Sequence, residues 1–407
     1  MEIRDEIRQR VLNAIDLSRD ISDDEILRMI REEVMHCAAD KRLSLDKRIE
    51  IQRDVFNSLR KLDVLQDLLE DDEITEIMIN GADHIFIEKH GRIERTHRRF
   101  SSEEKLYDVI QQIVADNNRI VNEMSPIVDA RLSDGSRVNV VLPPASVEGS
   151  ILSIRRFPKD PIHMTNLIEL GSLSEEMVEF LRLLVVSGYN MFISGGTGSG
   201  KTTFLNALTE FVPPDERVIT IEDSAELQPI GIANLVRLEA RDANLEGKLA
   251  ISIRDLVKTS LRMRPDRIIV GECRGGEALE VVQAANTGHD GSLSTGHANS
   301  CRDMIQRLEV MILMAMDLPM NAIRSQIASG IDIFVHLGRL KDKSRKVLEI
   351  AEVLGMEDGQ VKLATLYEFV QEGEENGRVI GTWRKRNELA MRRKLEMAGY
   401  GERMNGS

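Results

Sequence analysis

The pattern of apolar and polar positions changes twice along the chain of 407 residues. Residues 1–62 carry apolar side chains at helical spacing, as at Ile26 and Ile30. Ser22 and Glu25 precede this stripe and have the spacing of a capping box, in which each side chain bonds the other's backbone N–H. An apolar stripe of this kind is typical of amphipathic helices, so we expect a small helical module. Such a module either docks a partner or packs on its neighbours.

From residue 63 onward, apolar residues alternate with polar ones, as at Ile77 and Ile79 before the dipeptide Asn80-Gly81. Alternation at period two beside an Asn-Gly turn predicts an antiparallel hairpin. The same analysis predicts a helix and further strands, over residues 102–117, 131–142 and 151–157. The whole segment predicts an α+β domain of PAS-like type.

The remainder alternates short apolar runs with amphipathic segments. Runs at 217–222 and 267–271 predict buried strands, and residues 174–187, 251–263 and 277–286 predict helices. Such alternation is typical of a parallel sheet covered by helices, that is, of an α/β domain. We therefore expect five parts: a helical module at 1–62, the α+β domain at 63–157, a linker at 158–166, this α/β domain at 167–371, and a polar tail at 372–407.

The clearest motif is the octapeptide GGTGSGKT, which matches the P-loop pattern G-x-x-x-x-G-K-[ST]. It follows an apolar run and precedes a segment of helical spacing. Backbone amides of such a loop surround a polyphosphate, Lys201 reaches its β/γ-phosphates, and the hydroxyl of Thr202 holds Mg²⁺. The expected nucleotide-binding residues are Gly195, Gly196, Thr197, Gly198, Ser199, Gly200, Lys201, Thr202 and Thr203.

Two predicted strands end in acidic residues. Glu222 closes the run ITIE, and Glu272 closes RIIVGE. Strand ends in an open α/β sheet face the ligand crevice, and carboxylates there can hold Mg²⁺ or orient the attacking water. We expect Thr202, Glu222 and Glu272 to share the metal, without deciding which carboxylate activates water.

Composition narrows the protein class. The formal net charge of -14 disfavours a general affinity for nucleic-acid backbones. The three cysteines are too few for a disulfide framework or a four-thiolate zinc site, which favours a reducing compartment. The sequence shows neither a secretory signal nor an apolar stretch long enough to span a bilayer, so any membrane role is expected to depend on partners.

Four segments together carry a family resemblance. They resemble the Walker A, Asp-box, Walker B and His-box motifs of the type II/IV secretion ATPases, and read GGTGSGKT (195–202), ITIEDSAEL (219–227), RPDRIIVGECRG (264–275) and TGHDGSLSTGHANS (287–300). Two more segments are similar to tight-adherence (Tad/CpaF-type) pilus assembly ATPases, EITEIMING (73–81) and DARLSDGSR (129–137). The likeness extends to about residue 370. The zinc module of four cysteines typical of the type IVa and type II branches is missing.

The resemblance implies that residues 167–371 form a RecA-like P-loop ATPase domain. It also implies a homohexamer that hydrolyses ATP with Mg²⁺ beneath a polytopic inner-membrane platform protein. Such a motor is cytoplasmic, peripheral at the inner face of the membrane, acts on pilin indirectly and handles no nucleic acid. The resemblance also places His289 and His297 in the His box, where a neutral imidazole can bond phosphate oxygens or relay the nucleotide state. Arg131, Arg137 and Arg155 match arginines of the family's inter-domain region. Because no arginine near the P-loop is placed by a motif, we expect them to complete the site from a neighbouring subunit.

Two alternatives remain open at this level. A nucleic-acid motor shares the P-loop and sheet but needs a basic, often aromatic-lined channel. With ten Phe, four Tyr and one Trp in an acidic chain, this is the weaker hypothesis. A nucleotide-gated scaffold would bind ATP without appreciable turnover. DNA-stimulated hydrolysis would favour the first, and absence of phosphate release would favour the second.

Overall fold

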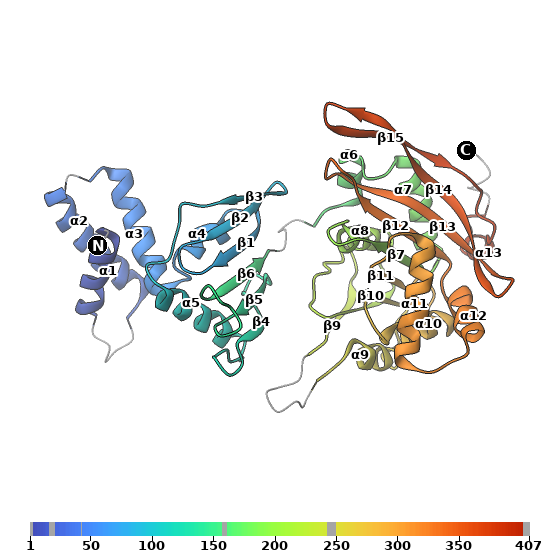
Figure 1. Ribbon diagram of the computed structural model, residues 1–407, viewed down its shortest axis with the longest axis horizontal. Helices are drawn as coiled ribbons and strands as arrows, with labels where there is room; N and C mark the ends of the chain where they lie inside the picture. The colour runs from blue at the N-terminus through green and yellow to red at the C-terminus, as the bar shows by residue number, and fades with distance from the viewer. Residues whose placement is uncertain (1–2, 16–20, 42, 157–160, 242–249, 402–407) are drawn as a thin grey trace. The chain divides into compact units, whose positions relative to one another are not determined.

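The computed structural model describes residues 3–15, 21–41, 43–156, 161–241 and 250–401. The chain divides into two compact units, Met1–Lys159 and Asp160–Ser407 (Figure 1). The expected linker at 158–166 begins in residues outside the described ranges, and its last part forms helix α6, Met164–Glu169. The structure therefore describes no irregular connection as long as the one expected.

Three helices make up the N-terminal module: α1 (Ile3–Ala14), α2 (Asp23–Lys41) and α3 (Leu45–Arg60). They pack around a small apolar core that includes Ile7, Ile30 and Val55. The module is also bonded to the domain that follows it, since the Lys105 ammonium donates to the carbonyl of Ser58 at 2.9 Å. Consequently the boundary expected at residue 62 lies inside one compact unit.

The rest of the first unit is an α+β domain. Its elements are α4 (Leu65–Glu70), β1 (Ile74–Asn80), β2 (Ile85–Lys89), β3 (Arg92–Arg95), α5 (Glu103–Asp116), β4 (Ile127–Arg131), β5 (Arg137–Val141) and β6 (Ile151–Arg155). The described strands form one antiparallel sheet in the order β3-β2-β1-β6-β5-β4. Alternate strand residues such as Ile77 and Ile79 share a core with Leu106 and Ile110 of α5. The period-two pattern thus reflects a sheet with one face covered by a helix.

The second unit is a larger α/β domain. Its first elements are α7 (Glu175–Val186), β7 (Met191–Gly195), α8 (Lys201–Leu208), η1 (Thr209–Phe211), β8 (Arg217–Glu222), β9 (Asn234–Glu239), α9 (Ile253–Ser260) and β10 (Arg267–Cys273). Its later elements are α10 (Glu277–Asn286), β11 (Leu293–Gly296), α11 (Cys301–Ala315), α12 (Met320–Gly330), β12 (Ile333–Arg339), β13 (Arg345–Glu357), β14 (Gln360–Glu375), β15 (Arg378–Lys385) and α13 (Arg393–Met397).

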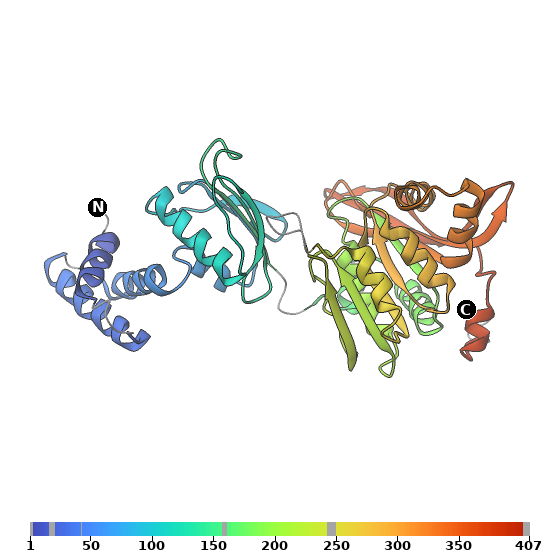
Figure 2. The ribbon, with the colours of Figure 1, turned by 90° about the horizontal axis from the view of Figure 1, so that it is seen from below.

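One sheet runs through this unit in the order β15-β14-β13-β12-β7-β11-β10-β8-β9. The strands from β12 to β9 in this order are parallel, and β13, β14 and β15 continue the sheet antiparallel. Met191 and Ile193 pack in the core with α7 and α8, whereas Phe192 packs in the core with α9 to α12. Helices therefore cover both faces of the sheet (Figure 2), which explains why β7 is apolar at consecutive positions.

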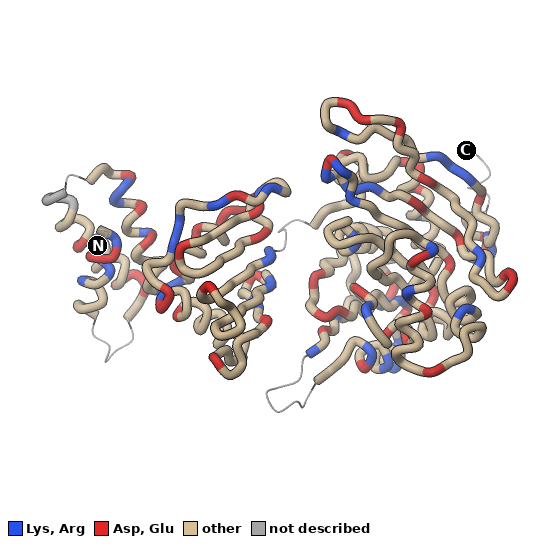
Figure 3. The backbone as a smooth tube through the Cα atoms, in the orientation of Figure 1, with Lys and Arg blue, Asp and Glu red and all other residues tan. Residues whose placement is uncertain are grey.

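The prediction of a polar tail at 372–407 is wrong for the first part of that segment, which continues the sheet. Residues up to Lys385 form the ends of β14 and the strand β15, which pair at Glu368↔Arg384 and Phe369↔Trp383. Basic and acidic positions both lie along these strands (Figure 3). Opposite charges pair across them, as in the 3.3 Å ion pair between Arg384 and Glu372. Cross-strand ion pairs and a few buried apolar side chains stabilise this pair of strands. Its composition is that of a solvent-exposed segment, so the sequence did not reveal the strands.

No helix in the described ranges is both long enough and apolar enough to cross a membrane.

Candidate active site

The P-loop joins β7 to α8 and is shaped by its glycines. A Cβ atom on Gly195 would lie 2.5 Å from Ser199 Oγ and 2.6 Å from the carbonyl oxygen of Leu337, so only glycine fits there. Gly200 caps α8 in the left-handed conformation, with φ +92°. The N-terminus of α8 therefore begins directly at the loop, where its unpaired N–H groups and positive dipole end favour an anion. Gly196, Thr197 and Gly198 are exposed, so the loop is open to a ligand.

Lys201 is buried in this loop, with 7% of its surface exposed. Its ammonium donates to the carbonyls of Gly195 at 3.2 Å and Gly196 at 3.1 Å. Burial lowers the pKa of Lys201 from its usual value, and the carboxylate of Glu272 opposes this shift. The ammonium thus donates to two backbone carbonyls. The oxygens of a bound phosphate could take their place as acceptors.

Four neighbouring parallel strands bring the predicted site residues to one edge of the sheet. In the order β7, β11, β10 and β8, they end at the P-loop, His297, Glu272 and Glu222 respectively. Since parallel strands share a direction, their carboxyl ends line the same crevice. Residues far apart in the sequence therefore meet at the position expected for a ligand.

His297 connects Lys201 to Glu272. Its Nδ1 lies 3.4 Å from Lys201 Nζ, and its Nε2 lies 2.6 Å from Glu272 Oε1. With an ammonium on one side, Nδ1 is the acceptor, which leaves the ring proton on Nε2, the nitrogen that lies within ion-pair distance of the carboxylate. Burial and the charge of Lys201 lower the pKa of His297, with Glu272 opposing. The imidazole is thus neutral and links the Walker A lysine to the Walker B glutamate.

Arg274 continues this network. Its guanidinium donates to Glu272 Oε2 at 2.5 Å and lies 3.5 Å from Asp223 Oδ2. The sequence analysis named no arginine of this domain as a site residue, whereas the structure places Arg274 beside Glu272. The signal was present in the sequence, because Arg274 stands two residues after Glu272 at the same strand end.

Glu222 is the most buried carboxyl group at this edge, with 4% of its surface exposed. Its Oε1 accepts the backbone N–H groups of Glu226 and Leu227, both at 2.9 Å. Its Oε2 is buried and has no hydrogen-bond partner among the described residues. Burial raises the pKa of Glu222 to about 7, against the lowering effect of these two N–H groups. A Cβ on Gly271 would lie 2.8 Å from Glu222 Cγ, so glycine before Glu272 makes room for Glu222.

The donor set fits a magnesium nucleotide. Mg²⁺ prefers oxygen ligands, keeps several waters and usually needs one or two carboxylates besides phosphate oxygens. The unpartnered Oε2 of Glu222 offers such an oxygen, and Thr202 lies in the first turn of α8. Within the described ranges, no cluster of three or more His, Cys, Asp or Glu side chains forms a metal site without a nucleotide.

Comparison with known proteins decides the family. The family described as Type II/IV secretion system protein matches residues 59–395. The chain belongs to this family of secretion ATPases. A putative conjugal transfer protein of Mycobacterium tuberculosis is 33% identical over 310 residues, which are 75% of this chain and 87% of that protein. PtlH, a type IV secretion system protein of Bordetella pertussis, is 31% identical over 315 residues, covering 71% of this chain and 93% of PtlH.

A solved structure supports the fold. The X-ray structure of the Legionella pneumophila ATPase DotB is similar with a TM-score of 0.50 and 23% identity, over 71% of this chain and 79% of DotB. At this identity the likeness concerns the fold alone. It agrees with the expected RecA-like domain preceded by an N-terminal domain.

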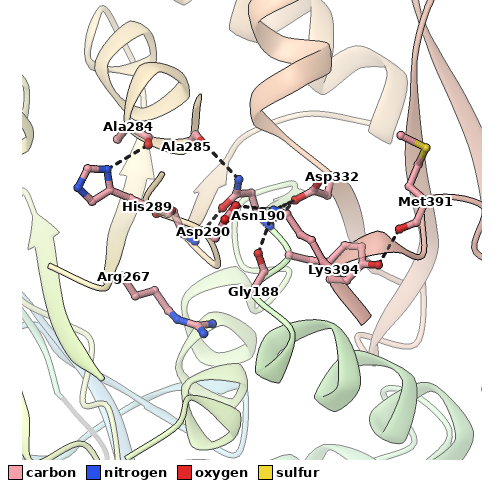
Figure 4. Close-up of polar contacts among 12 residues, drawn as sticks. Gly188, Asn190, Arg267, Ala284, Ala285, His289, Asp290, Asp332, Met391 and Lys394 are labelled. Carbon is pink, nitrogen blue, oxygen red and sulfur yellow. Dashed lines mark hydrogen bonds and ion pairs between the residues drawn. The ribbon is translucent and has the colours of Figure 1, made fainter. Parts of the chain in front are cut away.

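In this secretion ATPase, His289 does not lie with His297. It precedes β11, whereas His297 follows it, so the two histidines stand at opposite edges of the sheet. His289 donates from Nδ1 to the carbonyl of Ala284 at 3.3 Å, in the neighbourhood of Asn190 and Asp290 (Figure 4). The resemblance gave both His-box histidines a role in bonding phosphate oxygens or relaying the nucleotide state, and of the two the structure places His297 beside the P-loop lysine. Sequence proximity misled because a strand only four residues long separates the two edges.

The three arginines of the first unit come together on its sheet. Strand pairing places Arg131 opposite Arg137 and Arg137 opposite Arg155, in one row across β4, β5 and β6. Directly opposed residues of an antiparallel pair share a face. Arg155 also lies 3.9 Å from Glu76, its partner on β1. The sequence prediction did not include this juxtaposition, which depends on the register of three strands.

A cavity of about 260 Å³ adjoins the P-loop on the side of Gly200 and Thr203. Apolar side chains such as Leu167 and Phe204 line one part of it, and Arg345 lines another. An apolar cavity with a few polar groups beside a phosphate-binding loop suits the sugar and base of a nucleotide. This part of the site could not be predicted from the sequence, because α6, α8 and β13 are far apart in the chain and come together only in the folded domain.

Proposed function

We propose that this chain is a hexameric motor that hydrolyses ATP to power assembly of a type IV pilus of the tight-adherence class, or a related secretion step across the cytoplasmic membrane. The main support for this proposal is that His297 contacts both Lys201 and Glu272, while Glu222 lies at the end of the neighbouring strand. Membership of the secretion ATPase family supports the motor. The segments at 73–81 and 129–137 support the pilus class.

In the proposed mechanism, the P-loop amides and Lys201 bind the phosphates. Thr202 and Glu272 would hold Mg²⁺, whose charge would offset that of the phosphates. Glu222, with a free oxygen in a buried position, orients and deprotonates the attacking water. Glu272 is engaged by His297 and Arg274, so its charge and orientation are held by its neighbours.

The arginine row of the first unit is proposed to act on the nucleotide of an adjacent subunit. The strand register gathers Arg131, Arg137 and Arg155 in one row, so these side chains start from neighbouring positions on one face of the sheet. Guanidinium groups suit a polyphosphate because each can donate two parallel hydrogen bonds to phosphate oxygens. A guanidinium supplied in trans is worth about 10³ to 10⁵ in rate where such arginine fingers are known.

Phosphate release tests the ATPase assignment. Lys201→Ala should abolish both tight binding of MgATP and turnover, because it removes the principal phosphate ligand. Glu222→Gln should retain binding and lose turnover, because the amide keeps the shape of the side chain without its basicity. Turnover by Lys201→Ala at the wild-type rate would refute the site. Wild-type protein that binds MgATP without releasing phosphate would be a scaffold, and stimulation by DNA would favour the nucleic-acid motor.

The pilus assignment needs a cellular test. A strain producing Lys201→Ala in place of the wild-type protein should lack surface pili, while the variant still copurifies with a polytopic membrane protein. Normal piliation in that strain would show that the chain serves another secretion step. Failure to recover any polytopic membrane partner with wild-type protein would contradict the proposed membrane platform.

A further inference from the structure

The turn between β12 and β13 is a basic hairpin that reaches the P-loop. Residues 338–346 read GRLKDKSRK, with five cations and one acid. The turn closes through the N–H of Leu340 on the carbonyl of Ser344 and the N–H of Ser344 on the carboxylate of Asp342, at 2.8 and 3.0 Å. Lys343 takes the left-handed conformation, with φ +67°. The hairpin therefore has a defined shape.

Other elements hold this hairpin in place. Asp342 Oδ2 accepts the N–H of Val379 on β15 at 2.8 Å. Lys346 donates to the carbonyl of Gly171 at 2.7 Å and lies over the Trp383 ring, 5.4 Å from its centroid. These contacts come from β15 and from the segment after α6. The hairpin is thus fixed to the sheet extension rather than free to move in solution.

The hairpin contacts the P-loop through Arg345. Its Nε–H donates to the carbonyl of Gly198 at 2.9 Å, and a Cβ on Gly200 would lie 3.3 Å from Arg345 Cδ. In a trans peptide the C=O and the next N–H point in opposite directions. A donor on the carbonyl of Gly198 therefore turns the N–H of Ser199 the other way, where it meets the carbonyl of Gly196 at 3.3 Å. The contact orients a peptide of the loop itself.

We propose that Arg345 is a positioning residue of the ATPase site, which holds the glycine-rich loop in its phosphate-binding conformation before nucleotide arrives. The inference rests on the proposed ATPase function. Glycine loses the most conformational freedom on ordering, and a loop with four glycines in six residues, 195–200, is costly to order. An anchor that orders the loop beforehand lowers the cost that nucleotide binding would otherwise bear.

This role predicts a particular kinetic signature. Phosphates are bound in the ground state and in the transition state alike, so loss of the anchor should raise KM and leave kcat within about twofold. For Arg345→Ala we expect the Kd of MgATP to rise by about three- to tenfold, the range of one ordinary hydrogen bond, because solvent weakens the contribution of the charge at this exposed residue. Arg345→Lys keeps charge and a donor, and should recover part of this loss.

The matched control is Lys341→Ala, an exposed residue of the same hairpin for which no P-loop contact is recorded among the described residues. It removes one positive charge at a similar place. If Lys341→Ala weakens MgATP binding as much as Arg345→Ala does, general electrostatics explains the effect and the proposal is overturned. Unchanged nucleotide affinity of Arg345→Ala would overturn it as well.

A measurement without nucleotide separates this inference from the proposed function. Amide hydrogen exchange of residues 195–200 in the nucleotide-free full chain should be faster in Arg345→Ala than in wild type and Lys341→Ala. Wild-type protein that fails to bind MgATP would end the ATPase proposal, whereas this exchange difference would still show that Arg345 orders the loop. Equal exchange in all three proteins would refute the positioning role.

Discussion

At the scale of single residues, His297 makes the most consequential contact, because it joins a phosphate-binding lysine to a strand-end glutamate. Truncation to alanine should leave MgATP binding nearly intact but lower kcat by about 100-fold, as expected when reacting groups shift by an ångström. Steady-state phosphate release and equilibrium binding measure the two effects. His289→Ala is the control, since His289 lies at the other edge of the sheet and should retain wild-type kcat. Equal losses in both variants would contradict this placement.

His336 predicts a pH dependence of stability. It is buried on β12, with Nδ1 3.0 Å from Ser194 Oγ. Burial lowers its pKa below the usual value, with Lys201 acting in the same direction and Glu349 and Asp303 opposing. The unfolded chain therefore binds the proton more readily, so this group's stabilising contribution is present above about pH 6.5 and is lost as the pH falls toward the lowered pKa.

The measurement is the free energy of unfolding of the wild type and of His336→Gln at pH 7.5 and pH 5.5. The wild type should lose more stability on acidification than the variant does, because glutamine has no proton to gain. Other acidic groups titrate in both proteins and cancel in the comparison. An identical loss in the two proteins would show that His336 is protonated as easily when folded as when unfolded.

At the scale of elements, the short helix α13 is held by charge at the edge of the sheet opposite the P-loop. The Lys394 ammonium lies 2.7 Å from both Asp332 and Asp290 and donates to the carbonyl of Gly188 at 3.0 Å (Figure 4). The Tyr189 hydroxyl donates to the carbonyl of Met391 at 2.7 Å. Burial raises the pKa of Asp332, and Lys394 opposes this shift. Removing Lys394 would therefore leave the Asp332 carboxyl group without the cation that most stabilises its charge.

Lys394→Met should therefore destabilise the second unit by about 2 kcal/mol, less than for a fully buried pair because both side chains are partly exposed. Adding Asp332→Asn should restore part of this loss. Urea unfolding followed by the fluorescence of Trp383, the single tryptophan, reports on this unit.

Lys362→Met, which removes an exposed ion pair with Glu357, is the control and should change stability by less than about 1 kcal/mol. Full additivity of the two substitutions would mean that Lys394 and Asp332 do not interact.

At the scale of the whole molecule, the proposal that subunits complete each other's sites can be tested by complementation. Lys201→Ala and Arg137→Ala proteins should each be inactive alone. Mixed rings should regain some turnover, because an interface of the right polarity pairs an intact P-loop with an intact arginine row. Phosphate release at varied mixing ratios measures this, with demonstrated subunit exchange as the control. No recovery at any ratio would place the action of Arg137 within its own chain or outside catalysis.

Much of the fold follows from local patterns. Helical spacing, period-two alternation and the Asn80-Gly81 turn predict elements that the structure contains, because these patterns report which face of a single segment is buried. The P-loop is equally local, since its glycines and Lys201 lie in eight consecutive residues. Errors arose where charge concealed a strand, as in β15, whose polar side chains are paired across the sheet rather than along the chain.

Most of the elements, the phosphate-binding loop and the acidic strand ends could be predicted from the sequence, because each depends on residues close together in the chain. Which of these residues meet depends on the tertiary fold. The strand order puts His297 and Arg274 beside Glu272 and takes His289 to the other edge. It also brings Arg345 to Gly198 across 147 positions of sequence. The pairing of distant strands sets such contacts through register and sheet order, and neither is written in the local spacing of apolar residues.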